Sequence, residues 1–156
     1  MVFYLVTVGR LKDGAIRDAC LDYFTRVQRY VKLELVEVRD GGRRDNRAAL
    51  AREEEGRALL KAIPASAQVV ALTRVGKAET SLQFAGRLRE WRDRGLDVAF
   101  VIGGAHGLDE ELLKRANHRL SLSSWTLPHE LARLTLLEQL YRACTILRGE
   151  PYHKGG

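Results

Sequence analysis

Short runs of consecutive or alternating apolar residues are separated along the chain by longer stretches in which apolar residues recur every three or four positions. The short runs predict five β-strands, over residues 3–8, 33–38, 69–72, 98–102 and 120–122. The longer stretches predict five α-helices, over residues 16–30, 47–63, 82–94, 109–116 and 128–147. This alternation favours an α/β fold with a mostly parallel sheet and helices on both faces.

The ends of the last two predicted helices carry residue types that favour helix termini. Asp109 is expected to be the N-cap of its helix, Pro128 to lie in the first turn of the final helix, and that helix to end near Gly149. No internal repeat, low-complexity stretch or linker divides the sequence, so we expect one domain over residues 1–156. The basic segment 39–47 is interpreted as a solvated connection between elements.

The composition is that of a globular protein of the cytoplasm. Hydrophobic residues make up 46% of the sequence, enough to bury a core without disulfides or metals. The sequence has no run of about 18 apolar residues, so no membrane span is expected. The first residues form a strand pattern and lack the basic flank of a signal peptide. Cys20 and Cys144 lie far apart without a metal-type spacing, which favours a reducing compartment.

The formal net charge of +6 suits a polyanionic partner, because Lys and Arg release counterions when they contact phosphates. Many basic proteins bind no nucleic acid, so the charge alone does not identify an RNA-binding protein. The four histidines share no metal-type spacing, and no metal site is predicted.

Candidate chemistry lies where predicted strands end, because open parallel sheets bind ligands at the carboxyl ends of their strands. Three segments qualify, at residues 72–73, 102–107 and 121–129. The second contains Gly103 and Gly104, a pair that allows a tight turn and a close approach of the backbone to a ligand. The third is rich in small hydroxyl residues. Neither the dinucleotide fingerprint nor the Walker A loop is present.

The final helix contains a charge among apolar residues. Arg133 falls in line with an apolar stripe, where an arginine is costly unless it is paired or reaches an edge. Two interpretations stay open: a snorkelling or ion-paired side chain, or an arginine at an active site or a dimer interface. The helix is apolar nearly all round, and a helix of this kind must be covered on two sides. We therefore expect a homodimer formed through this helix.

Motifs along the whole chain resemble the RlmH family, the 23S ribosomal RNA pseudouridine N3-methyltransferases of the SPOUT class. The resemblance is densest in the C-terminal third. The matching motifs are Val8-Gly9, Glu54-Glu55-Gly56, Leu72 with Gly76-Lys77, residues 100–104 with Gly107-Leu108, Ser121-Leu122-Ser123, residues 126–129, Arg133, Glu138, residues 140–143 and Pro151-Tyr152-His153-Lys154.

The resemblance implies an α/β knot, with a C-terminal trefoil knot that holds S-adenosylmethionine (AdoMet) as the methyl donor. It assigns AdoMet contacts to Leu72, Gly103, Gly104, Ser123, Ser124, Trp125, Thr126, Leu127 and Pro128. It implies catalytic roles for His129, Arg133, Arg142, Tyr152 and His153, and RNA binding by Lys154. The proton acceptor could be His129 or His153, since a histidine pKa lies near neutrality. The implied partners are a second copy of the chain and 23S rRNA, methylated in the helix 69 loop within the large subunit or the whole ribosome.

The tail over residues 151–154 is expected to be a free C-terminal segment. Lys154 stands where the family also has Arg, and a lysine cannot form the bidentate contacts of an arginine. Two alternatives remain: a SPOUT methyltransferase that acts on another RNA such as tRNA, and a ribosome-binding module without catalysis. The intact Gly103-Gly104 and 121–129 segments favour the enzyme.

Overall fold

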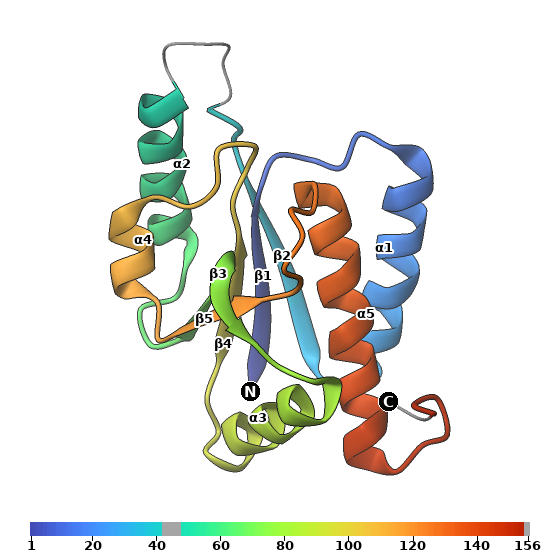
Figure 1. The fold of residues 1–156 in the computed structure, drawn as a ribbon. Helices are drawn as coiled ribbons and strands as arrows, with labels where there is room; N and C mark the ends of the chain where they lie inside the picture. The colour runs from blue at the N-terminus through green and yellow to red at the C-terminus, as the bar shows by residue number, and fades with distance from the viewer. Residues whose placement is uncertain (42–47, 155–156) are drawn as a thin grey trace.

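A computed structural model describes residues 1–41 and 48–154, and in this part of the chain five strands form one sheet (Figure 1). The strands are β1 (Val2–Val8), β2 (Lys32–Val38), β3 (Gln68–Ala78), β4 (Val98–Ile102) and β5 (His118–Ser121). Their order across the sheet is β2-β1-β4-β3-β5, and each neighbouring pair is parallel. Residues 42–47 of the predicted basic connection lie outside the described residues.

Helices cover both faces of the sheet, which confirms the predicted α/β class. One face packs against α1 (Gly14–Val27), α3 (Ser81–Asp93) and α5 (His129–Arg148). The other packs against α2 (Ala48–Ala62) and α4 (Glu110–Arg115), seen to the left of the sheet in Figure 1. In the described part of the chain, no helix is long and apolar enough to cross a membrane. The trefoil knot implied by the resemblance stays a prediction.

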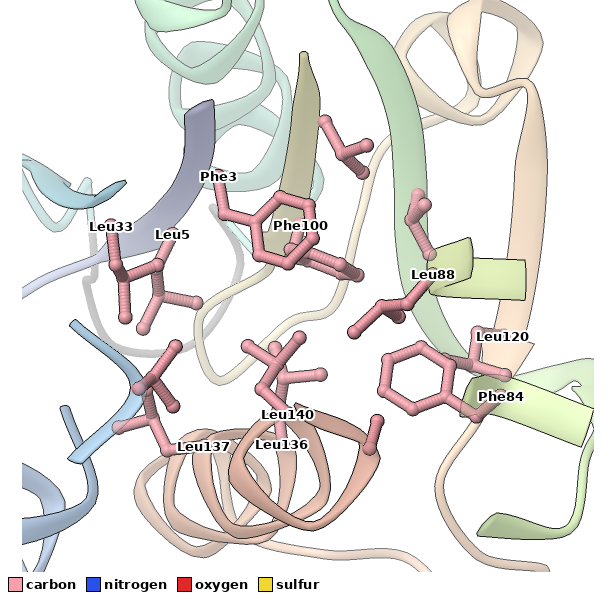
Figure 2. Close-up of a cluster of buried hydrophobic side chains, with 14 of the residues drawn as sticks. Phe3, Leu5, Leu33, Phe84, Leu88, Phe100, Leu120, Leu136, Leu137 and Leu140 are labelled. Atoms are coloured by element: carbon pink, nitrogen blue, oxygen red, sulfur yellow. The ribbon is translucent and has the colours of Figure 1, made fainter. Parts of the chain in front are cut away.

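The larger hydrophobic cluster lies between the sheet and α5 (Figure 2). Phe100 of β4 is at its centre, and its ring makes edge-to-face contacts with Phe3 at 5.5 Å, Trp91 at 5.9 Å and Phe84 at 6.2 Å between centroids. Because β4 is the central strand, its side chains are buried on both faces, as its apolar sequence predicts.

The helix ends follow the sequence signals closely. The Asp109 carboxylate accepts a hydrogen bond from the backbone N–H of Leu112 at 3.0 Å, which confirms the predicted N-cap. Pro128 immediately precedes α5 rather than lying in its first turn. Gly149 ends that helix with a φ of 67°, a conformation that glycine adopts without steric cost.

The expected reason for a dimer, an apolar helix without enough cover, is not what the structure shows. Within one chain α5 packs against the sheet, α1 and α3. Tyr141, for example, contacts the rings of Tyr23 and Tyr30 near α1. The apolar positions around α5 are therefore mostly covered without a partner, and the homodimer stays a prediction that needs other support.

Strand β3 is longer than its apolar run predicted, because its second half is exposed and pairs only with the edge strand β5. The register between the two strands breaks after Leu72. Leu72 pairs with Leu120, and so does Lys77, so residues 73–76 are looped out of the ladder. We call these four residues the β3 bulge.

Candidate functional site

A cavity of about 570 Å³ opens at the β3 bulge and the carboxyl end of β4, beside the start of α5. Its volume lies in the range of about 300–1,000 Å³ that small-molecule sites occupy. The three predicted strand-end segments all contribute to it, although they are far apart in sequence. The lining residues are Leu72, Thr73, Arg74, Ile102, Gly103, Gly104, Ala105, Gly107, Leu108, Leu122, Ser123, Trp125, Thr126, Leu127, Pro128, His129 and Ala132. We call this cavity the strand-end pocket.

Of the residues assigned to AdoMet by the resemblance, only Ser124 is missing from this lining; it is exposed. Among the residues assigned to catalysis, His129 lies at the pocket, whereas Arg133, Arg142, Tyr152 and His153 do not line it. The assigned residues therefore form two groups, one at the pocket and one elsewhere.

The two glycines at the end of β4 are required by the protein's own packing. A Cβ atom on Gly103 would lie 2.7 Å from the backbone of Gly107, which closes the turn. A Cβ atom on Gly104 would lie 3.1 Å from Glu55 Oε2 and from a methyl group of Val8, on the interior side. A side chain at either position would therefore meet the protein itself, which agrees with the tight turn expected from the sequence, while the approach to a ligand stays a prediction.

The carboxyl group of Glu55 lies behind this turn, on α2. Its side chain is 2% exposed, and Oε1 accepts a hydrogen bond from the backbone N–H of Gly41 at 3.2 Å. Oε2 has no hydrogen-bond partner among the described residues. Burial raises the pKa of Glu55 to about 7, with a further contribution from the hydrogen-bonded Asp40 carboxyl. A group of this kind can carry a proton near neutral pH.

The segment between β5 and α5 is held by its own hydroxyl groups. Ser121 Oγ donates to the carbonyl oxygen of Ser123, and Ser123 Oγ accepts from the backbone N–H of Trp125, each at 2.9 Å. Within residues 1–41 and 48–154, no side chain caps the N-terminus of α5, which begins at His129. The first N–H groups of the helix are therefore left for solvent or for a ligand.

Arg133 is a buried ion-paired residue, the first of the two interpretations of the sequence. It is 3% exposed, and its guanidinium donates to Glu37 Oε2 and to Thr7 Oγ1 at 2.8 Å each, and to the carbonyl oxygen of Gly9 at 3.1 Å. These contacts join α5 to the carboxyl-terminal ends of β1 and β2. Arg133 thus fixes the start of α5 relative to the sheet.

The tail is docked on its own chain, so the prediction of a free C-terminal segment is wrong. The hydroxyl of Tyr152 donates to Glu138 at 3.1 Å and lies 3.2 Å from the Tyr23 hydroxyl, and its ring packs on Tyr141 at 4.6 Å. Burial, followed by these hydrogen bonds, raises the pKa of Tyr152 above its ordinary value. Arg142 pairs with the same Glu138 carboxylate at 2.7 Å.

The contacts of Tyr152 with Glu138 and Tyr141 lie at a different part of α5 from the strand-end pocket. Arg142 is about 20 Å further along the helix axis than His129, at about 1.5 Å rise per residue. His153 is half-buried, and its Nδ1 atom has no partner among the described residues, while Lys154 is exposed. Within one chain, the tail residues and the pocket are not brought together.

The sequence did not predict the placement of Glu55, which lies behind the pocket, or of Arg74, which lines it. Glu55 belongs to a matching motif, but nothing in the pattern of α2 indicates that its carboxyl lies behind Gly104. Arg74 occurs in the β3 bulge, which the strand pattern did not predict. A charged residue two positions after the apolar run over residues 69–72 is the signal that could have identified it.

Comparisons with known proteins agree with this geometry. A family model described as "Predicted SPOUT methyltransferase" matches residues 1–153. Proteins named "Ribosomal RNA large subunit methyltransferase H" are 49% identical in Gemmatimonas aurantiaca and 51% identical in an Anaeromyxobacter strain, each over 96% of this chain and 97% of the relative. A relative from Methanoregula boonei, "Putative ribosomal RNA large subunit methyltransferase H", is 43% identical over 96% of this chain and 98% of its own.

Solved structures show the same fold at low sequence identity. A probable methylase family protein from Haemophilus influenzae aligns with a TM-score of 0.60 and 15% identity, over 98% of this chain and 70% of its own. A putative methylase family protein from Neisseria gonorrhoeae aligns with a TM-score of 0.58 and 14% identity, over 99% of this chain and 86% of its own. The chain belongs to the SPOUT methyltransferase family, and within it to the group named ribosomal RNA large subunit methyltransferase H.

Proposed function

We propose that this protein is an AdoMet-dependent methyltransferase that methylates N3 of a pseudouridine in the helix 69 loop of 23S rRNA, in assembled ribosomes of the cytoplasm. One observation carries the proposal. The strand-end pocket collects, from three distant segments, nearly all of the residues that the family resemblance assigns to the methyl donor. The relatives' names, which specify the large ribosomal subunit, support the RNA substrate.

The chemistry of the pocket fits a ligand with an apolar ring system and a zwitterionic end. Leu72, Ile102 and Leu127 provide apolar walls, and the turns around Gly103 and Ser123 bring backbone groups to the lining. The uncapped N-terminus of α5 can receive an anionic group such as a carboxylate. When bound, AdoMet supplies an electrophilic methyl group. The protein's contribution is to hold donor and acceptor in line and to exclude water.

The acceptor nitrogen must lose its proton when it is methylated. His129 is the histidine of this chain that lies both at the pocket and at the first residue of α5, so it is the better placed of the two candidate proton acceptors. A neutral imidazole there can take the proton if it comes within hydrogen-bond reach of the base. His153 could serve only if the tail reached a pocket.

In a homodimer, the tail of one chain could reach the strand-end pocket of the other. Tyr152 is docked against Glu138 and Tyr141, which lie about 14–18 Å along α5 from His129 at about 1.5 Å rise per residue. The tail motif would therefore act at the pocket of a second copy. Exposed apolar side chains on α1 and α5 provide candidate contact area: Leu21 is 63% exposed and Leu131 is 39% exposed. Arg142, Tyr152, His153 and Lys154 would then be supplied by the partner subunit.

Titration calorimetry with AdoMet, followed by mass mapping of rRNA methylated by the purified protein, tests the proposal. We expect binding in the micromolar range or tighter, and one added methyl group in helix 69 of assembled ribosomes. The variant G103A should bind AdoMet far more weakly, because the new Cβ atom cannot fit 2.7 Å from the Gly107 backbone without moving the turn. The control variant is G86A, which adds a methyl group to open space on α3.

Three results would count against the proposal. Absence of AdoMet binding to the folded protein would favour a ribosome-binding module without catalysis. Methylation confined to tRNA would retain the reaction type and replace the substrate. Equal AdoMet affinity of wild type and G103A would place the donor away from the strand-end pocket.

A further inference from the structure

Two side chains that line the strand-end pocket, one of them in the segment assigned to the methyl donor, are exposed to solvent. The first is the indole of Trp125, which is 81% exposed although it lines the pocket. The second tryptophan, Trp91, is 2% exposed and packs against Phe100. Leaving the largest apolar side chain in water is unfavourable, so its position at the pocket mouth requires an explanation.

The backbone that carries Trp125 is fixed, while its side chain is open. The hydrogen bond from the Trp125 N–H to Ser123 Oγ, at 2.9 Å, and that from the buried Ser121 Oγ to the Ser123 carbonyl hold the loop from both ends. A ring presented from a rigid loop loses little conformational entropy when it binds a partner. The loop therefore presents the exposed indole from a backbone that its own hydrogen bonds hold in place.

The second side chain is Arg74, which lies in the β3 bulge. The bulge depends on Gly76, where a Cβ atom would lie 2.7 Å from the carbonyl carbon of Arg119, so only glycine fits against β5. Arg74 is exposed and lines the pocket. It forms no ion pair with any carboxylate of the described residues.

Further cations follow Arg74 along β3 and on the paired strand β5. Lys77 and Arg119 are exposed on the same edge of the sheet, and the nearby Glu79 is already paired with Arg87. A free guanidinium among other cations repels basic partners and attracts a phosphate. The exposed indole of Trp125, which lines the same pocket, offers a flat apolar face.

We propose that Trp125 and Arg74 form an acceptor subsite for single-stranded RNA, in which the indole stacks on an unpaired nucleobase and the guanidinium binds a neighbouring phosphate. Bases splayed out of an RNA loop are recognised by aromatic stacking together with phosphate contacts. The inference rests on the proposed function, since it is the RNA acceptor that must approach the mouth of the donor pocket. It extends that function by assigning two side chains to substrate recognition.

The two tryptophans provide a direct optical test. Trp91 is shielded from solvent, so acrylamide quenching of the fluorescence of the full-length protein reports mainly on Trp125. A hairpin RNA with the helix 69 sequence should reduce this quenching in the wild type. It should leave the fluorescence of W125F, which retains only Trp91, unchanged.

Affinity for the same hairpin separates stacking from charge. W125A should bind about tenfold more weakly, while W125F, which keeps a ring, should stay within about threefold of wild type. R74A should weaken binding and flatten the dependence of log affinity on log salt by about one unit. The matched controls are L50A, an exposed leucine on α2, and R89A, an exposed arginine on α3, and neither should change affinity.

Three outcomes would overturn the subsite. Quenching that is already weak in the free protein and grows on dilution would mean that a second copy covers Trp125. Shielding by AdoMet alone, with no further effect of RNA, would assign the indole to the donor. Equal hairpin affinity of W125A, R74A and wild type would remove both residues from RNA recognition. Failure of the proposed function is distinguishable, because RNA could still shield Trp125 in a protein that neither binds AdoMet nor methylates.

Discussion

Replacing Glu55 with glutamine should stabilise the protein at neutral and alkaline pH. Glutamine keeps the shape of a protonated glutamic acid, and its carbonyl oxygen can still accept the hydrogen bond from the Gly41 N–H. It also removes a carboxyl group that cannot ionise favourably in its buried position beside Asp40. The variant therefore isolates the cost of the negative charge.

The magnitude and the sign follow from the two pKa values. Folding raises the pKa of Glu55 from its ordinary value of 4.5 to about 7. Between these pH values the folded state holds a proton that the unfolded state releases, so the stability of the wild type falls as pH rises from 4.5 to 7 and is constant above. At about 1.4 kcal/mol per pKa unit, the loss is about 3 kcal/mol. The variant E55Q has no ionisable group at this position, so its unfolding free energy does not show this loss.

Urea unfolding of wild type, E55Q and E54Q at fixed protein concentration, at several pH values from 4.5 to 8, measures the effect. The advantage of E55Q over wild type should grow by about 3 kcal/mol between pH 4.5 and 7 and then remain level. E54Q, which removes an exposed carboxylate one residue earlier on α2, should follow the wild type. If the curves of E55Q and wild type run parallel across this range, the buried Glu55 is not protonated near neutral pH and the reasoning fails.

Three other variants test contacts that hold the site. R133M should cost about 3 kcal/mol of unfolding free energy, because it leaves the buried Thr7 hydroxyl and the partly exposed Glu37 without their partner; a cost below about 1 kcal/mol in urea melts would contradict this. Y152F should lower stability by about 1 kcal/mol, since it keeps the ring on Tyr141 but loses the hydrogen bond to Glu138; an unchanged thermal midpoint would show that the tail is not docked. G76A should destabilise by about 1–3 kcal/mol through its contact with β5, and a neutral effect on the denaturant midpoint would mean that the β3 bulge shifts freely.

The order and class of the elements were already determined by the sequence. Apolar side chains are buried in the folded state, so the run over Val98–Ile102 predicted a strand buried on both faces, and the structure places β4 there. Local capping chemistry similarly predicted the roles of Asp109 and Gly149, because each acts within a few residues of its own position. The strand-end pocket followed from the same pattern, since parallel strands direct their carboxyl ends to one edge of the sheet.

Only the tertiary structure decided which distant groups meet. Glu55 lies behind Gly104, Arg133 joins Thr7 and Glu37, and Tyr152 reaches Glu138 instead of remaining free. Strand register and helix placement create these contacts. The periodicity of apolar residues along the chain predicts which positions are buried, but it does not predict which side chains they contact. A polar side chain in an apolar pattern therefore shows that a compensating group must exist, while its identity depends on packing between segments that the sequence keeps far apart.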